Sequence, residues 1–342
     1  METPQLVYSR EELLRSHEYA RPQVVAGRRL HGGFLDDGSY MPPRALVRSA
    51  AVDAWTQALR ARGGEILDAD SSLLAGVRYP SVAQQKLLLQ EGLGQTFWNT
   101  LTITGVIEAR GRLLAEIEFP DFQRITETDL SGWALGHLPA LLLAHGIDEG
   151  GEPGRSIGGH DEMWFALRDL AFGPTEYPVP VVPENIARPE TGRAFPELRE
   201  AYERTIDFLL NLLMIEFRAE RGFALSEELL RDPELFRDRR SEALEAAEIV
   251  DRIRTDERIH VTSLRLYLGE IRSLDLKTDA GGTVAGADVV DTLWARIVQW
   301  ATVEQPPLAA AQQKELLTGR IREHPEADRV LARFDERAED AS

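Results

Sequence analysis

The sequence contains no cysteine. This absence excludes disulfides, thiolate nucleophiles, zinc–thiolate sites and iron–sulfur clusters, and it leaves histidine and carboxylate side chains as the strong metal ligands. Any metal bound by this chain would therefore sit among oxygen and nitrogen donors.

The chain also lacks a long apolar run and an excess of positive charge. No segment approaches the ~20 consecutive apolar residues that a membrane span needs. The N-terminus, METPQLVYSREELL, has no signal-peptide pattern, so we expect a cytoplasmic protein. With 39 basic and 57 acidic residues, the formal charge of -18 repels phosphate backbones and anionic lipids. We expect neither nucleic acid nor a membrane as a partner.

Strand patterns are scarce, whereas apolar residues recur at helical spacing along most of the chain. The strand candidates are short apolar runs such as VVAG and VPVV. Residues 174–196 contain six prolines and cannot form a regular helix or a central strand, so they are expected to be an extended crossover. The sequence predicts an all-α protein with a four-helix-bundle core, ferritin-like or heme-oxygenase-like, made of two sequential helix pairs.

Three regions are expected along the chain. Residues 1–75 form an N-terminal extension with loops and a helix, 76–280 form the metal-binding bundle, and 281–342 form C-terminal helices packed on it. The predicted helices span 49–62, 81–118, 161–172, 197–222, 241–274, 287–303, 308–322 and 326–338. The pattern over 81–118 is either one helix or two that meet near Gly92, and Pro139 either kinks its helix or begins it.

The segment IRTDERIHVTSLRLYLGEI, residues 253–271, places a glutamate and a histidine on the apolar stripe of a predicted helix. Steps of three and four residues connect Ile253, Glu257, His260 and Leu264, so Glu257 and His260 share the buried side. One Glu-x-x-His is close to what chance gives in a chain this rich in glutamate, so helical phase carries the argument. A buried carboxylate needs a partner, and residues at i and i+3 can reach one ion.

A weak internal repeat adds further candidates. VIEARGRLLAEI around Glu108 and MIEFRAERGFAL around Glu216 share an apolar run, a glutamate and arginine-bearing turns. Each is followed by an apolar helix with a histidine, His137 in the first half and His260 in the second. Glu216 either binds a metal, pairs with an arginine, or turns to the surface at the end of its helix.

This layout resembles the ferritin-like di-metal carboxylate family, in which two helices give one Glu each and two others give a Glu-x-x-His each. The resemblance covers about residues 95–275. All-helical di-iron oxidases with a heme-oxygenase-like fold are a variant of the same hypothesis. The resemblance makes Glu216, Glu257 and His260 one half-site.

The first half-site departs from the pattern, because Ala134 stands where the family has a glutamate. The candidates to replace that glutamate are His145, Asp148, Glu149, His160 and Asp161. A further alternative pairs Glu116 or Glu118 with His145. For His160 and Asp161 we favour helix capping at 161–172, and we expect His17, His31 and His324 at the surface.

The resemblance implies a di-iron oxidase or oxygenase that activates dioxygen to oxidise or hydroxylate a small organic molecule. The metal ligands it implies are Glu108, His137, His145, Glu216, Glu257 and His260, with Asp148, His160 and Asp161 as substitutes. Two iron ions are the expected cofactor and manganese is the alternative. The expected partners are a small-molecule substrate, an electron-donor protein and a second copy in a homodimer. The competing hypothesis is a non-catalytic helical scaffold or small-molecule-binding protein without metal, which would bury Glu216 and Glu257 against arginines.

Overall fold

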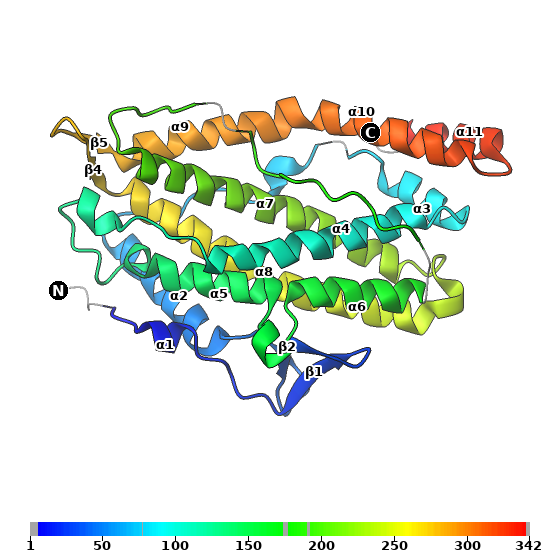
Figure 1. Ribbon diagram of the computed structural model, residues 1–342, viewed down its shortest axis with the longest axis horizontal. Coiled ribbons are helices and arrows are strands. Elements are labelled where there is room, and N and C mark those ends of the chain that lie inside the picture. The colour runs from blue at the N-terminus through cyan, green and yellow to red at the C-terminus, as the bar shows by residue number, and fades with distance from the viewer. Residues whose placement is uncertain (1–5, 77, 174–176, 190–191, 340–342) are drawn as a thin grey trace.

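The computed structural model describes residues 6–76, 78–173, 177–189 and 192–339. It is built mostly of helices, with a three-stranded and a two-stranded antiparallel sheet at the periphery (Figure 1). The predicted all-α class is therefore confirmed. The N-terminal elements are α1 (Arg10–Leu13), β1 (Arg21–Val25), β2 (Arg28–Phe34), β3 (Tyr40–Met41) and α2 (Ala45–Ala61).

Five helices surround the centre of the molecule: α4 (Gln95–Gly111), α5 (Leu138–Gly150), α6 (His160–Phe172), α7 (Glu200–Arg231) and α8 (Arg240–Arg272). Helices α5 and α6 follow one another in a single row, and α4, α7 and α8 run beside them (Figure 1). Helix α8 packs against both α7 and α6. The loop between α5 and α6 is joined to β2, because His31 N donates to Gly158 O at 2.8 Å and Gly158 N donates to Arg29 O at 3.0 Å.

The remaining elements flank these five helices. They are α3 (Val82–Gln90), β4 (Asp275–Lys277), β5 (Thr283–Ala285), α9 (Gly286–Gln299), a π-helical turn (Trp300–Glu304), α10 (Gln305–Arg322) and α11 (Ala327–Glu339). Short 3-10 turns lie at Ser71–Leu74, Arg112–Ala115, Phe122–Ile125, Ala134–His137, Pro153–Arg155 and Arg237–Arg239. Helix α9 packs on α7 and α8, and α11 packs on α3. Across the described ranges, we find no helix with the length and apolarity to cross a membrane.

The helix boundaries resolve the two alternatives that the sequence left open. The pattern over 81–118 is divided into α3 and α4, because Gly92 takes a φ of +76° that ends the first helix. Pro139 lies in the first turn of α5 and therefore begins this helix. Helix α7 runs past its predicted end at 222, and an ion pair between Glu227 and Arg231 at i and i+4 supports the extension.

Of the two strand candidates, VVAG lies in the N-terminal sheet and VPVV does not form a strand. Val25 pairs with Arg28 across a two-residue turn, and both turn residues, Ala26 and Gly27, have positive φ, as a type I′ hairpin requires. The predicted crossover contains neither helix nor strand over 177–189 and 192–196. Its residues 174–176 and 190–191 lie outside the described residues.

Two apolar cores lie on either side of a polar layer in the middle of the central helices. Along α7, one core includes residues up to Phe217 and the other begins at Phe223. Along α8, the second core ends at Ile253 and the first resumes at Leu264. The α8 turn between them carries three buried polar residues, Asp256, Glu257 and His260. The regular apolar packing of the helices is thus interrupted at one level, and the candidate site lies there.

Candidate metal centre

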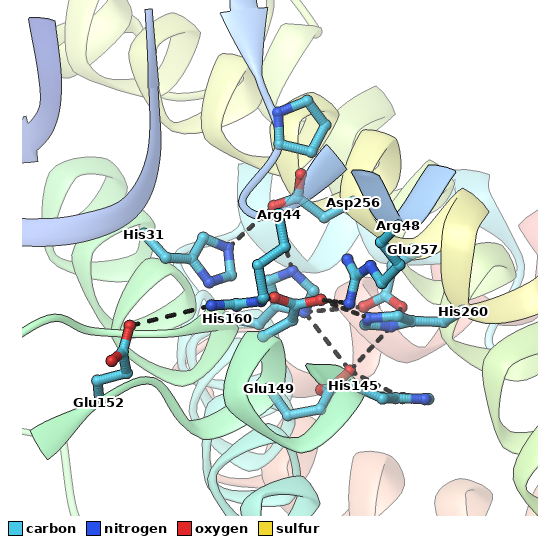
Figure 2. A network of polar contacts seen from close by, with 12 residues as sticks. His31, Arg44, Arg48, His145, Glu149, Glu152, His160, Asp256, Glu257 and His260 are labelled. Atoms are coloured by element: carbon cyan, nitrogen blue, oxygen red, sulfur yellow. Dashed lines mark hydrogen bonds and ion pairs between the residues drawn. The ribbon is translucent and has the colours of Figure 1, made fainter. Parts of the chain in front are cut away.

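Four glutamates and three histidines converge in the polar layer between the two cores. Figure 2 labels five of them: His145, Glu149, His160, Glu257 and His260. They form two groups, and in each group one ligand atom per residue lies within 4.8 Å of all the others. The first group is His145, Glu149, Glu216 and His260. The second group is Glu108, Glu149, His160 and Glu257. All seven side chains are buried, and we call this set the ligand cluster.

The helices place these side chains through ordinary helical spacing. His145 and Glu149 are four residues apart on α5, and Glu257 and His260 are three apart on α8, so each pair shares one helix face. Helix α4 approaches α5 closely at Gly111, where an added Cβ would lie 2.6 Å from the Cβ of Glu149. A side chain at position 111 would therefore push Glu149 out of the cluster.

In the first group, two histidine rings stack face to face beside two carboxylates. The rings of His145 and His260 are 3.7 Å apart between centroids and 13° from parallel. His145 Nε2 lies 3.0 Å from Glu216 Oε1 and 3.3 Å from Glu149 Oε1. His260 Nδ1 lies 3.1 Å from Glu149 Oε1. Two histidines and two carboxylates thus point their donor atoms at one small volume.

In the second group, a single histidine faces three carboxylates. His160 Nδ1 lies 3.0 Å from Glu257 Oε1 and 3.7 Å from both Glu108 Oε2 and Glu149 Oε1. This nitrogen is buried, and although Glu257 Oε1 lies 3.0 Å away, the ring is not aligned for a hydrogen bond with any described residue. A buried polar atom without a partner normally signals a missing ion or water. His160 Nδ1 therefore fits a position at which a cation would be held.

Glu149 belongs to both groups. One of its oxygens, Oε1, lies 3.1 Å from a ring nitrogen of His260, 3.3 Å from one of His145 and 3.7 Å from one of His160. A carboxylate placed between two donor sets can contact a cation in each. This geometry makes Glu149 the candidate bridge between two ions.

Without a cation, the ligand cluster holds protons. Burial and the charge of Glu149 raise the pKa of Glu108 well above its usual value, and burial and the charge of Glu257 raise that of Glu216 to about 7. Burial lowers the pKa of His160 and His260, but the charge of Glu257 and the hydrogen bonds to the surrounding carboxylates together outweigh it and keep both pKa values well above the ordinary range. The carboxylates thus retain protons or draw protons onto the histidines.

A second layer of buried charges surrounds the ligand cluster. Asp148 bonds to Arg44 and Arg48, and Asp256 bonds to His31 and Tyr40. The buried carboxylates of both layers are Glu108, Asp148, Glu149, Glu216, Asp256 and Glu257, and the buried arginines beside them are Arg44 and Arg48. With neutral histidines, six carboxylates and two guanidiniums leave four negative charges in excess. Two divalent cations would balance this excess.

Five of the six ligands implied by the resemblance meet in the ligand cluster: Glu108, His145, Glu216, Glu257 and His260. The sixth, His137, is not brought to the others. It lies in the 3-10 turn before α5, half-buried, where its ring stacks on Trp55 with a centroid separation of 5.1 Å. The turn and the proline that begins α5 carry His137 to the end of the helix away from Glu149.

The proposed substitutes take three different places. His160 is a member of the ligand cluster and the first residue of α6, whereas Gly159 caps this helix, so the capping role favoured for His160 is wrong. Asp161 accepts from Gly159 N at 3.1 Å and Glu162 N at 2.6 Å, as a cap at the start of α6. Asp148 lies in the second layer beside His260. The alternative ligands Glu116 and Glu118 are exposed.

Glu149, one of the candidates to replace the glutamate that Ala134 lacks, lies in the ligand cluster, because α5 continues through the sequence IDEG to Gly150. Its spacing of four from His145 was the available signal. The expectation that His31 lies at the surface is wrong. Its side chain is 4% exposed and bonds to Asp256. Its glycine-rich surroundings form a strand, β2, that lies against the site.

A scan against protein-family models and searches of curated proteins and of solved structures gave no match for this chain. The case for function therefore rests on the geometry of the site.

Proposed function

We propose that this chain binds two divalent transition-metal ions in the ligand cluster and uses them to oxidise a small organic molecule with dioxygen. The observation that carries the proposal is the pair of four-residue donor groups that share Glu149. One ion would be held by His145, Glu149, Glu216 and His260. The other would be held by Glu108, Glu149, His160 and Glu257.

The donor set fits such ions on three independent grounds. His160 Nδ1 is buried and without a hydrogen-bond partner among the described residues, yet it faces three carboxylates. The excess of four buried negative charges matches two divalent cations. Oxygen and imidazole donors without thiolate suit iron and manganese, and iron is favoured for dioxygen chemistry. The scaffold hypothesis required arginine partners, but the partners found for Glu216 and Glu257 in the described chain are histidines.

We also propose that the helical core resembles those of ferritin-like and heme-oxygenase-like di-metal proteins. In this proposal α4, the row formed by α5 and α6, α7 and α8 are the four helical positions of the core. The first half-site then carries His145 and Glu149 at i and i+4 on α5, with His160 added from α6. This order of ligands differs from the two Glu-x-x-His pairs of the ferritin-like pattern.

A bound pair of iron ions would supply the electrons that reduce dioxygen, with an external donor restoring them. The chain itself would hold the ions at a fixed separation through Glu149 and keep bulk water away through the two apolar cores. A cavity of about 450 Å³ is bordered by His31 and Arg44, the residues that hold Asp256 and Asp148. Its volume suits a small organic substrate, and we propose it as the approach to the site. A cavity of similar volume near Phe208, about 460 Å³, borders neither the ligand cluster nor the second layer.

Metal analysis of protein produced with iron tests the proposal. We expect close to two iron ions per chain in the wild type, an optical spectrum that changes on exposure to air, and dioxygen uptake when a reductant is added. His145→Ala should lose iron, whereas His137→Ala is the matched control and should retain it, because His137 lies at the start of α5 and only His145, within the helix, enters the cluster. A wild type without stoichiometric metal, or equal metal in the two variants, would contradict the proposal.

A further inference from the structure

Each of two ligand histidines is held on its outer nitrogen by a fully buried aspartate. His260 directs Nδ1 into the ligand cluster, and its Nε2 lies 3.1 Å from Asp148 Oδ2. His160 directs Nδ1 into the cluster, and its Nε2 lies 3.4 Å from Asp256 Oδ2. Asp148 and Asp256 are both 0% exposed. A carboxylate on the outer nitrogen of a ligand histidine fixes the tautomer and the orientation of the ring.

The two aspartates act on different donor groups. His260 belongs to the group of Glu216, and His160 belongs to the group of Glu108. Asp148 therefore reaches one ion position and Asp256 reaches the other. Each donor group is thus supported by one aspartate of the second layer.

Both aspartates are themselves held by the N-terminal part of the chain, outside the central helices. Asp256 Oδ2 lies 2.9 Å from His31 Nε2 on β2 and accepts from Tyr40 OH on β3 at 2.8 Å. Asp148 accepts from Arg44, which precedes α2, and from Arg48 Nη1 on α2 at 2.6 Å. Figure 2 shows His31, Arg44 and Arg48 of this segment close to His160 and His260.

The backbone conformation of the N-terminal segment positions these side chains. Arg44 has a φ of 58°, in the left-handed region that a non-glycine residue seldom adopts. This conformation starts α2 and places its guanidinium, 3% exposed, on Asp148. Strand β2 is fixed to the loop before His160 by the two hydrogen bonds with Gly158. The sheet and His160 are therefore held in register.

We infer that Asp148 and Asp256 are positioning residues, one for each metal ion, and that residues 31–48 complete the metal centre from outside the bundle. This inference rests on the proposed function, since it presupposes that the two donor groups hold ions. Asp256 Oδ2 already receives three hydrogen-bond donors, and two divalent ions balance the buried charge. The atoms of His31, His160 and Asp256 lie close enough to suggest a third ion position. We assign the contacts of His31 and His160 with Asp256 to hydrogen bonds instead.

Stepwise cobalt(II) titration of the full chain under argon tests the inference, followed by visible absorption and competition with a chromophoric chelator. Asp256→Asn should weaken one of the two binding steps by about 10- to 100-fold and leave the other near its wild-type value, and Asp148→Asn should weaken the other step. The matched control is Glu270→Gln. Glu270 is a 0% exposed carboxylate on α8 that accepts from Ala134 N and Leu135 N, away from the ligands. It should change stability without changing either step.

A double-mutant cycle separates positioning from general destabilisation. His31→Gln alone should weaken the step affected by Asp256→Asn, and it should have little further effect in the Asp256→Asn background. Asp148→Asn could fail to fold, because it removes the carboxylate that the buried guanidiniums of Arg44 and Arg48 share. In that case Arg48→Gln tests the same donor group while Arg44 remains on Asp148.

The outcomes distinguish the inference from the function on which it rests. No cobalt bound by the wild type would refute the proposed function. Two ions bound by the wild type, with unchanged steps in the aspartate variants, would refute only the inference. Three ions in the wild type and two in His31→Gln would also refute it, because His31 would then be a ligand.

Discussion

Metal binding should release protons, and the number follows from the charges of the site. In the metal-free protein the raised pKa values of Glu108, Glu216, His160 and His260 keep protons in the ligand cluster at neutral pH. His145 adds another, because its bonds to Glu149 and Glu216 outweigh the burial that lowers its pKa. Because the pKa of Glu216 is about 7, this group is only partly protonated at neutral pH, and the five groups together hold between four and five protons. These protons offset the four excess negative charges, and the ions must displace them.

The expected magnitude is about four protons released for two ions, because each divalent ion replaces about two positive charges held as protons. The sign follows directly. A raised pKa means that the group is protonated over a wider pH range, so protons compete with the metal at low pH. Affinity should rise with pH and level off above these pKa values. The Glu216 contribution should end near its pKa of about 7.

Isothermal titration calorimetry measures this number when the same titration is repeated in buffers of different ionisation enthalpy. We expect about four protons per two ions at pH 6, and fewer at pH 8. Glu270→Gln is a demanding control. Burial also raises the pKa of Glu270 to about 7, but this residue lies outside the ligand cluster, so the count should not change. Tight binding with no buffer dependence between pH 6 and pH 8 would refute the reasoning.

Three other predictions follow from the described contacts. Glu149→Gln should lose both ions, whereas Glu216→Gln should affect mainly one, as metal analysis of the two purified variants would show; equal losses would contradict the bridging role. Saturation with metal at 100 times the dissociation constant should stabilise the fold by about 2.7 kcal/mol per site in denaturant titrations, and an unchanged midpoint would contradict specific binding to the native state. Ala134→Glu should restore the family pattern in sequence but add no ligand, because Ala134 N lies 3.2 Å from the buried Glu270 carboxylate. A second buried carboxylate there should destabilise the fold by several kcal/mol; a third metal ion or unchanged stability would contradict this.

The burial of Glu216, Glu257 and His260 could be predicted because its signal is local. Glu257 and His260 follow the apolar stripe of α8, and Glu216 is enclosed by apolar neighbours on α7. Burial of a charged residue on such a stripe can be inferred from helical periodicity alone. These three ligands are also the ones that the family pattern matched best.

The first half-site was harder to predict because its ligands lie at helix ends. Glu149 is the penultimate residue of α5 and His160 is the first residue of α6, and both border a glycine-rich stretch that is typical of a loop. His137 follows the predicted apolar pattern, but Pro139 begins the helix and excludes the histidine from it. The internal repeat therefore selected the wrong histidine partner for Glu108.

The second layer could not be predicted from sequence periodicity. His31 and Asp256 are 225 residues apart, and Arg44 and Asp148 are 104 apart. No local pattern records such pairs. The sequence around His31, rich in glycine and aspartate, is typical of an exposed loop, and burial there depends on the docking of β2 against the loop before α6.

The placement of the ligand cluster between two apolar cores has a consequence for how the molecule unfolds. Helices α7 and α8 pass through both cores, but the level between the cores holds buried carboxylates and histidines, which protons alone would neutralise in the absence of cations. The ions would then couple the two ends of the molecule, so that the metal-loaded protein melts in one cooperative transition. In the metal-free protein the two ends should lose this coupling and melt in separate calorimetric steps. Cooperativity of the whole fold would thus depend on a centre that contributes no apolar contact.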